Sequence, residues 1–378
     1  MVRQQSGAAG FSAFIPSPLP PRPALILDGT LQERLETASR EVGRLDSITT
    51  LLPNPGLFIY MYVRKEAVLS SQIEGTQSSL SDLLRAENDG TAGVPFDDVN
   101  EVLNYTAAME HGLERLENGF PLSLRLLRDI HRILMTGARG GNRTPGEFRT
   151  SQNWIGGSRP GNARFVPPPA HEMQEAMASL EKFLHDEGVR MPLLVRTGLV
   201  HAQFETIHPF LDGNGRMGRL LITFLLCNGG ALSKPLLYLS LYLKENRDEY
   251  YERLQRVRTH GDWEGWMNFY LVGVETVARL ATQTASRIIG LFERDRRRIH
   301  ALGKGAASAL SVFEILRNRA VVSIPRAVKE LNLSKQTVNA AVRRIEGLGI
   351  IREESGRLRG RHWAYAEYIE LLNAGTSS

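Results

Sequence analysis

Apolar residues recur at helical spacing through most of the chain. Between residues 31 and 48 they form one face of a helix, and polar residues cover the opposite face. The same pattern predicts further helices at residues 57–73, 96–116, 122–134, 170–185, 192–207, 214–227, 242–258 and 264–277, the last running on toward residue 298. We therefore expect a mainly helical, all-α protein.

Two segments depart from this helical pattern. Short β-prone runs at residues 152–155 and 164–166 flank a stretch rich in Gly, Pro and Asn, which is typical of a hairpin. Beyond residue 305, three short helical segments precede β-prone runs at 350–352 and 363–365. A helix-turn-helix followed by a hairpin resembles a winged helix. The sequence thus predicts a small β-hairpin in the helical part and a C-terminal winged helix-turn-helix domain.

The chain has enough length for two or three domains. Residues 1–28 are rich in Pro and Ser and are expected to form an extended, partly disordered arm. A helical region is expected at 29–120 and a helical core at 121–300. A basic run and two glycines near residue 300 separate this core from the winged-helix domain, which is expected at 305–372.

Composition narrows the function classes. Hydrophobic residues make up 42% and charged residues 23% of the chain, as in ordinary soluble proteins. The net charge of +5 is too small to indicate nucleic-acid binding by itself. The single cysteine, Cys227, excludes an intrachain disulfide. Neither a leader pattern nor an apolar run near 18 residues is present, so we expect a cytoplasmic protein without a membrane partner.

Chemically active residues concentrate between His208 and Arg219, in the stretch HPFLDGNGRMGR. His208 can take a proton near neutral pH, and Asp212 is an oxygen ligand of the kind that Mg²⁺ accepts beside phosphates. The glycines at 213–215 can form an anion-binding nest at a helix N-terminus. Arg216 and Arg219 share a helical face from which both can reach a polyphosphate. Together these are the parts of a phosphoryl or nucleotidyl transferase.

Three other interpretations of this stretch were weighed. The glycines of 213–218 match the dinucleotide fingerprint formally, but a helix precedes them and no acidic residue follows at the required distance. His201, Glu205 and His208 lie at i, i+4 and i+7 and could form a metal-binding face, although HExxH is absent. A plain glycine-rich loop before a helix would explain the glycines, but not the histidine, the acid and the two arginines together.

The stretch resembles the motif of the Fic family, HPFx[DE]GN[GK]RxxR, at every defined position. The resemblance implies a Fic fold with its catalytic core at 121–300, which transfers AMP from ATP to a hydroxyl of a target protein. It implies that His208 is the base and Asp212 the Mg²⁺ ligand. Some relatives have Lys at the position of Gly215, and one such branch phosphorylates, so Gly215 favours AMP transfer. The residues implied in nucleotide binding are Asp212, Gly213, Asn214, Gly215, Arg216, Met217, Gly218 and Arg219.

A second pattern of the family lies upstream, where an inhibitory helix is expected at residues 57–75. Fic proteins carry [ST]xxxE[GN] in this helix, and Ser70, Glu74 and Gly75 match it. The resemblance implies that Glu74 pairs with Arg219 and competes with the γ-phosphate of ATP for its guanidinium. In some relatives the same glutamate supports the removal of AMP. Taken alone, Glu74 would be interpreted as an ordinary solvated residue.

The resemblance assigns roles to two further regions. In relatives the hairpin is a flap over the active site, which would bind a target segment by main-chain pairing; the alternative is a plain surface hairpin. Tyr250 is expected to border the adenine, and aromatic packing between helices is an equal alternative. The flap residues expected to dock the target are Ile155, Arg164, Phe165 and Val166.

The predicted winged-helix domain is basic. From Leu316 to Trp363 the chain has eleven Lys and Arg residues against four Asp and Glu residues. Protein contact or dimerisation is as plausible for this domain as DNA binding, because fold does not fix function. If it binds DNA, the residues expected to face the DNA are Lys335, Gln336, Asn339, Arg343, Arg357, Arg359 and Arg361.

These observations predict a protein adenylyltransferase that uses ATP and Mg²⁺ and is inhibited by its own Glu74. The acceptor would be a Ser, Thr or Tyr hydroxyl on a target protein or on the protein itself, and a homodimer is possible. One alternative is a DNA-binding regulator whose Fic core senses a nucleotide. The other is a Fic enzyme that removes AMP or transfers another nucleotide.

Overall fold

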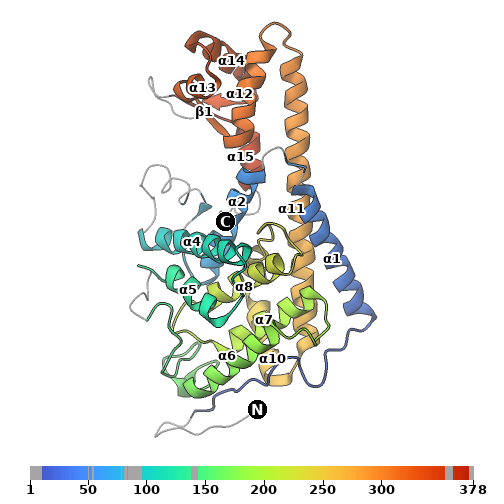
Figure 1. The fold of residues 1–378 in the computed structure, drawn as a ribbon, viewed down its shortest axis with the longest axis vertical. Coiled ribbons are helices and arrows are strands. Elements are labelled where there is room, and N and C mark those ends of the chain that lie inside the picture. Colours follow the sequence, from blue (N-terminus) through green and yellow to red (C-terminus); the bar gives the residue numbers. More distant parts are fainter. Residues whose placement is uncertain are drawn as a thin grey trace. The chain divides into compact units, whose positions relative to one another are not determined.

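The computed structural model describes residues 11–49, 51–52, 55–77, 79–80, 83, 96–137, 144–353 and 361–373. Arg357 and Arg359, two of the residues predicted to face DNA, lie outside these ranges. The described chain is mainly helical, with a small three-stranded antiparallel sheet near the C-terminus (Figure 1). Within the described ranges, every helix is too short or too polar to cross a lipid bilayer.

The chain divides into two compact units. Residues 1–43 and 63–278 belong to the first unit, and residues 44–62 and 279–378 to the second. The domain boundaries proposed from the sequence stay a prediction. Among the described residues, the α-helices that begin before residue 300 are α1 (Gly29–Thr49), α2 (Pro55–Ile73), α4 (Phe96–Glu117), α5 (Leu124–Leu134), α6 (Ala170–Leu184), α7 (Leu193–Ile207), α8 (Asn214–Asn228), α9 (Ser240–Glu245), α10 (Arg247–His260) and α11 (Trp263–His300).

Helix α8 lies at the centre of the first unit and packs against α4, α5 and α7. Its sequence is apolar on nearly all sides, as expected of a helix that other helices surround. Two arginines in its first turns are also buried, so the core of this unit contains charged groups at one end of α8. The fully buried side chains of α8 are Met217, Leu220, Leu221, Phe224 and Leu226.

Two predicted helices differ from the structure. The helix expected at 242–258 is interrupted at Asn246, where α9 ends and α10 begins. The Asn246 side chain donates a hydrogen bond to the Tyr242 carbonyl, and such local bonding by Asn competes with a continuous helix. Helix α2 begins at Pro55, two residues before the predicted start at 57, because proline is well tolerated in a first helical turn.

The predicted hairpin is reduced to a single antiparallel bridge between Ile155 and Phe165. The Ile155 N–H donates to the Phe165 carbonyl at 2.8 Å, and the Phe165 N–H donates back at 3.1 Å. The ladder cannot extend further, since residues 167–169 are prolines without an N–H donor. The connecting loop contains a short 3₁₀ turn, Pro160–Asn162.

The described part of the Pro-rich arm, residues 11–28, has an extended course without helix or strand. It packs on the first unit, where the Phe14 N–H donates to the Val166 carbonyl at 2.9 Å. The Gln203 side chain donates to the Ser17 carbonyl, also at 2.9 Å. The arm therefore contacts both the hairpin segment and α7.

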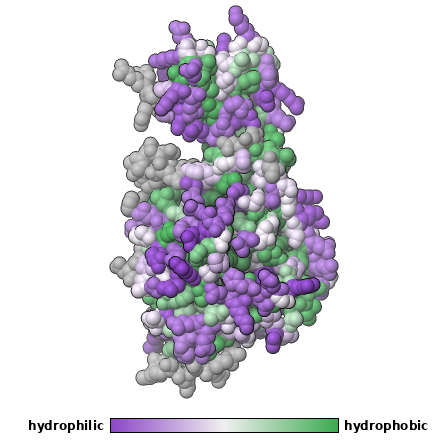
Figure 2. Space-filling view, in the orientation of Figure 1, coloured by the Kyte–Doolittle hydropathy of each residue, from purple (hydrophilic) through white to green (hydrophobic). Residues whose placement is uncertain are grey.

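Residues Ala306–Asn373 are called the C-terminal module here. The sheet has the order β1 (Val321–Ser323), β3 (His362–Ala364) and β2 (Arg352–Glu353), with Val322 opposite Trp363 and Arg352 opposite Ala364. Strand β1 and helix α15 (Ala366–Asn373) were not predicted. In Figure 2 hydrophilic residues surround a smaller hydrophobic area on this module. The elements are α12 (Ala306–Arg319), β1 (Val321–Ser323), α13 (Ile324–Leu331), α14 (Lys335–Gly347), β2 (Arg352–Glu353), β3 (His362–Ala364) and α15 (Ala366–Asn373).

Candidate functional site

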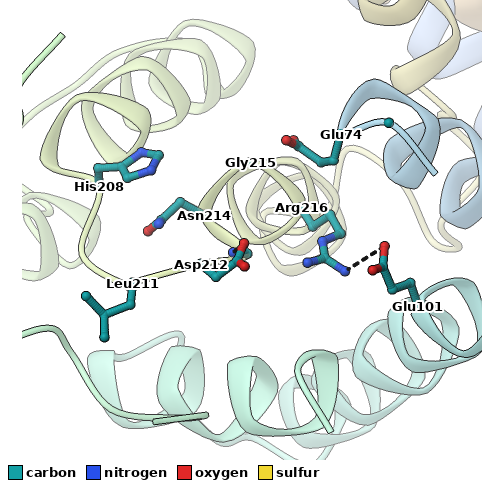
Figure 3. Close-up of a pocket in the computed structure, with 10 residues that line it drawn as sticks. Glu74, Glu101, His208, Leu211, Asp212, Asn214, Gly215 and Arg216 are labelled. Atoms are coloured by element: carbon teal, nitrogen blue, oxygen red, sulfur yellow. Dashed lines mark hydrogen bonds and ion pairs between the residues drawn. The ribbon is translucent and has the colours of Figure 1, made fainter. Parts of the chain in front are cut away.

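A cavity of about 300 Å³ opens where α7 ends and α8 begins. Side chains from the ends of α2 and α7 and from the first turns of α4 and α8 surround it (Figure 3). The lining is polar apart from one leucine and the glycines. It consists of Glu74, Gly75, Glu101, His208, Leu211, Asp212, Gly213, Asn214, Gly215 and Arg216.

The loop that connects α7 to α8 directs the N-terminus of α8 at this cavity. His208 ends α7 in the left-handed region, with φ 51°, and Gly213 precedes α8 with φ 75°. The Asn214 side chain closes the loop between them, because it accepts from the Phe210 N–H and donates to the Phe210 carbonyl, both at 2.8 Å. The free N–H groups at a helix N-terminus can bind an anion. The N-terminus of α8 therefore faces the cavity, and the anion-binding nest stays a prediction.

The His208 imidazole is neutral at physiological pH. Burial, with the nearby Arg258 and Arg149 guanidinium groups, lowers the pKa of His208 to about 3. Among the described residues its Nδ1 atom has no hydrogen-bond partner. A neutral imidazole beside an anion site can accept a proton from an incoming group.

Arg149 and Asn153 hold the backbone around His208, and neither was predicted from the sequence. Arg149 is 1% exposed, and its Nε donates to the His208 carbonyl at 2.9 Å. Another of its nitrogens donates to the Pro168 carbonyl. The Asn153 side chain donates to the Phe210 carbonyl at 3.0 Å. A loop arginine with only carbonyl partners leaves no periodic pattern in the sequence, which explains why it was missed.

His131, on α5, supports the loop from the opposite side. Its Nδ1 accepts from the Gly146 N–H at 2.9 Å, so its Nε2 carries the proton and donates to the Asp212 carbonyl at 3.0 Å. The ring stacks on Phe210 with 3.7 Å between centroids. Burial lowers the pKa of His131 to about 4, which keeps this tautomer neutral. A histidine on the otherwise apolar face of the predicted helix was a signal that could have identified it.

Arg219 is 2% exposed and is bound by the C-terminal end of α2. Its Nε donates to Ser70 Oγ at 2.7 Å, and its Nη2 donates to the Ser70 carbonyl at 3.0 Å and to Glu74 Oε1 at 2.7 Å. Burial alone would raise the pKa of Glu74, but the charge and hydrogen bond of Arg219 lower it overall. The structure thus brings together Ser70, Glu74 and Arg219, while the inhibitory role of the Glu74–Arg219 pair stays a prediction.

The other motif arginine, Arg216, has different partners. It is 3% exposed, and its Nη1 lies 3.6 Å from Glu101 Oε2 on α4. Its Nη2 lies 3.5 Å from Met135 Sδ. Among the described residues, Nε and Nη1 of Arg216 have no hydrogen-bond partner. Buried guanidinium donors that line a cavity are well placed for an anionic ligand. Glu101 was not predicted, although it falls on the buried stripe of its helix with Tyr105 and Ala108.

Gly215, in the first turn of α8, lies beside the Glu74 carboxylate, which follows the end of α2. A Cβ atom at this position would lie 2.2 Å from Glu74 Oε1 and 3.0 Å from Arg219 Nη1. No side chain fits there while Glu74 contacts Arg219. The glycine therefore permits both the anion nest and the Glu74–Arg219 pair.

Not every predicted nucleotide-binding residue lies at the cavity. Met217 is fully buried, and the Gly218 carbonyl accepts from His201 Nδ1 at 2.9 Å. Tyr250 is 1% exposed and donates from its hydroxyl to His201 Nε2 at 2.9 Å. Its ring packs with Tyr251 and the aromatic residues of α11, as in the packing alternative. Met217, Gly218, Arg219 and Tyr250 are not among the described residues that line the cavity.

Two of the three competing interpretations of the motif, the dinucleotide fingerprint and the metal-binding face, do not fit the structure. Helix α7 precedes the glycines, where a dinucleotide fingerprint requires a strand. In the described chain, no group of three or more His, Cys, Asp or Glu residues could hold a metal ion. His208 leaves the helical face because of its left-handed conformation, and both nitrogens of His201 are already bonded.

The flap residues are only partly available for main-chain pairing. Phe165 and Val166 are buried, and the Arg258 guanidinium lies 3.9 Å from the Phe165 ring centroid. The Val166 carbonyl accepts from the chain's own Phe14. Ile155 is half-buried and Arg164 is exposed. One position of the predicted docking edge is thus already paired with the arm.

The residues around the cavity are chemically compatible with a nucleoside triphosphate and Mg²⁺. The unpartnered nitrogens of Arg216 suit phosphate oxygens, whereas Glu74 Oε1 occupies the space over Gly215. Mg²⁺ needs few protein ligands when phosphates supply the others, so the one carboxylate of Asp212 is sufficient.

Fold and site define a mainly helical protein with a polar cavity at the loop between α7 and α8. A family model described as "Fic/DOC family N-terminal" matches residues 32–114, and one described as "Fic/DOC family" matches residues 121–226. Together they cover half of the chain. The chain belongs to the Fic/DOC family.

The relatives that match are distant. The protein adenylyltransferase Fic of Culex quinquefasciatus is 29% identical over 311 residues, which are 76% of this chain and 57% of that protein. The protein of the same name from Aedes aegypti is 30% identical over 261 residues, 66% of this chain and 47% of that protein. The chain thus spans about half the length of these relatives, of which it is a distant homologue.

Solved structures share the fold. A Fic family protein from Desulfovibrio desulfuricans G20 aligns with a TM-score of 0.61 at 21% identity, over 90% of this chain and 97% of that chain. Residues 134–508 of Fic-1 from C. elegans align with a TM-score of 0.53 at 20% identity, over 69% and 73% of the respective chains. The mainly helical Fic fold predicted from the sequence is confirmed.

Proposed function

We propose that this protein is a nucleotidyltransferase that transfers AMP from ATP to a protein hydroxyl. The observation that carries the proposal is the cavity, in which a neutral His208 imidazole, the N-terminus of α8 and the buried Arg216 face one small space. This arrangement supplies a base and a site for phosphate together. The name of the related adenylyltransferases supports the same reaction class.

In the proposed reaction His208 accepts the proton of a Ser, Thr or Tyr hydroxyl. The hydroxyl oxygen attacks the α-phosphorus of ATP, the bond from that phosphorus to the bridging oxygen breaks, and pyrophosphate leaves. The α8 N-terminus and Arg216 bind the phosphate oxygens, and Asp212 would hold Mg²⁺, which neutralises phosphate charge when bound. Arg149 and Asn153 keep His208 in place through the loop backbone.

We further propose that the protein holds itself inactive through Glu74. The carboxylate lies 2.7 Å from Arg219 Nη2, so it occupies a donor that a γ-phosphate would otherwise bind. It also touches the space above Gly215, where the nucleotide would approach the helix N-terminus. Both effects would leave ATP bound in a position unsuited to AMP transfer.

The test uses ATP labelled at the α-phosphate, Mg²⁺ and a cell lysate, with wild type, Glu74→Gly and His208→Ala proteins. We expect faint protein labelling with wild type, at least about tenfold more with Glu74→Gly, and none with His208→Ala; a lost hydrogen bond between charged groups corresponds to about this factor. Glu74→Gln is the matched control for size, since it removes charge and keeps the side-chain volume.

A parallel reaction with γ-labelled ATP separates the reaction types. Label from the α-position alone indicates AMP transfer, whereas γ-label on protein indicates phosphoryl transfer. Competition by unlabelled GTP, CTP and UTP identifies the nucleotide donor. Equal labelling by wild type and Glu74→Gly would contradict the inhibitory role, and labelling by His208→Ala would contradict the proposed base.

A further inference from the structure

Glu101 contacts two functional elements with a single oxygen atom. Its Oε2 accepts a hydrogen bond from Thr76 Oγ1 at 2.8 Å and lies 3.6 Å from Arg216 Nη1. The Glu101 side chain is only 7% exposed. Figure 3 shows Glu101 on α4 joined to Arg216, with Arg216 between Glu74 and Glu101 in this view. A buried carboxylate requires such compensation, and here two separate segments provide it.

The first of these segments carries Glu74. Thr76 follows Glu74 by two residues and is 5% exposed. The next residue, Gln77, donates from its N–H to Asp98 Oδ2 at 2.9 Å. Asp98 and Glu101 both lie near the start of α4. The chain after Glu74 is therefore held to α4 by contacts that do not involve Arg219.

The second element is the phosphate-binding arginine. Arg216 and Glu101 lie within ion-pair distance but form no hydrogen bond that would fix the guanidinium. A phosphate in the cavity would attract Arg216 and repel the Glu101 carboxylate, which faces the same space. A carboxylate held at Arg216 therefore opposes the binding of phosphate.

We propose that Glu101 is a positioning residue that couples phosphate binding at Arg216 to the segment holding Glu74. While Thr76 binds Glu101, the carboxylate stays beside Arg216 and the segment stays fixed. When phosphate binds, repulsion displaces Glu101 and weakens the Thr76 contact. Because coupling between two sites is reciprocal, loss of the Thr76 contact strengthens nucleotide binding. This inference rests on the proposed function, since it concerns regulation of the same site.

The substitution that tests the coupling is Thr76→Val, which removes the hydroxyl and nearly preserves the side-chain shape. We expect it to tighten binding of ATP with Mg²⁺ about tenfold and to raise AMP transfer by a similar factor, the amount that one hydrogen bond to a charged group supports. Thr76→Ser retains the hydroxyl and is the matched control, which should behave like wild type. Glu101→Gln removes the charge and should also tighten ATP binding.

Two measurements separate the coupling from a general structural effect. ATP affinity is measured by calorimetric titration, and AMP transfer by α-label at saturating ATP, each in the wild-type and the Glu74→Gly background. In the Glu74→Gly background, Thr76→Val should still tighten ATP binding through Arg216. It should no longer raise transfer at saturating ATP, because no Glu74 remains to be released.

Equal ATP affinities for Thr76→Val and Thr76→Ser would overturn the proposal. A gain in transfer that persists undiminished in the Glu74→Gly background would overturn it as well. Should Thr76→Val fail to fold, Glu101→Gln alone tests the proposal. Unchanged ATP affinity of Glu101→Gln would show that the Glu101 charge does not oppose phosphate binding, which would overturn the proposal. If no protein is labelled but Thr76→Val still binds ATP more tightly than Thr76→Ser, the proposed AMP transfer is wrong and the proposed coupling is supported.

Discussion

The cavity beside His208, with the adjoining Glu74–Arg219 contact, and the groove of the C-terminal module both contain basic residues, but they bury them to different degrees. Arg216 and Arg219 are 3% and 2% exposed. The groove, about 540 Å³, is lined by exposed Lys335 and Arg343 together with apolar residues such as Trp363. A buried charge must have a partner or a ligand, whereas an exposed charge is already solvated. The buried arginines therefore indicate a specific ligand or partner for the first region, whereas the exposed charges of the groove indicate none.

The difference predicts unequal costs of removing a basic side chain. Arg219→Ala should lower the free energy of unfolding by about 3 kcal/mol, because it removes a buried cation from its hydrogen-bonded and charged partners. Those partners include Ser70 and Glu74, with Glu205 also within electrostatic range. Lys335→Ala should change the stability by less than about 0.5 kcal/mol. Urea denaturation of both variants measures the contrast.

Glu74→Ala is the control for this first prediction. It removes the other member of the pair, whose side chain is 36% exposed, and should cost clearly less than Arg219→Ala. Equal losses of stability for Arg219→Ala and Lys335→Ala would show that burial does not distinguish the two regions.

A second prediction sharpens the comparison through pH. Burial raises the pKa of Glu205 to about 7, from a usual value of about 4.5 in the unfolded chain. The Glu205 carboxyl therefore keeps its proton to higher pH in the folded state than in the unfolded chain. Its contribution to stability is full below pH 4.5 and is lost as the pH rises to 7. Glu205→Gln mimics the protonated form and should be more stable than wild type by about 3 kcal/mol at pH 8.

The same two proteins should be equally stable below pH 4.5, where the carboxyl of wild type is protonated in both states. Thermal denaturation at pH 4 and pH 8 provides both values. A stability difference that does not change with pH would mean that Glu205 titrates normally in the folded protein.

The same contrast explains how much the sequence could predict. The apolar periodicity indicated the helices that build the core, because burial of one face leaves a 3.6-residue pattern. The motif at 208–219 indicated the loop and the helix start at Asn214. These features depend on residues that are close in sequence and have few structural alternatives.

Residues that support the site from a distance were not predictable in this way. Arg149 and Asn153 donate hydrogen bonds to backbone carbonyls of a loop some 55 residues away in the chain. Glu101 on α4 contacts Arg216 on α8. Such contacts depend on tertiary packing, and no local pattern encodes them. The assignment of Tyr250 came from family resemblance, while its burial depends on neighbours in α7 and α11.

The smallest predicted effect concerns the C-terminal module. The predicted DNA-facing residues that are described include Lys335 and Arg343, both exposed on α14. If they contact phosphates, binding to duplex DNA should be weak and should fall linearly on a log–log plot against salt. We expect each of Lys335→Ala and Arg343→Ala to reduce that slope by about one, as measured by fluorescence anisotropy with labelled duplex DNA.

Arg297→Ala is the matched control, because Arg297 is 83% exposed and lies on α11 rather than α14. Its substitution should leave the slope unchanged, so that a loss confined to Lys335 and Arg343 identifies α14 as the DNA-contacting helix. Equal slopes for all four proteins would mean that these exposed charges contact no phosphate. The groove beside Trp363, which combines apolar and basic residues, would then be better explained by contact with another protein.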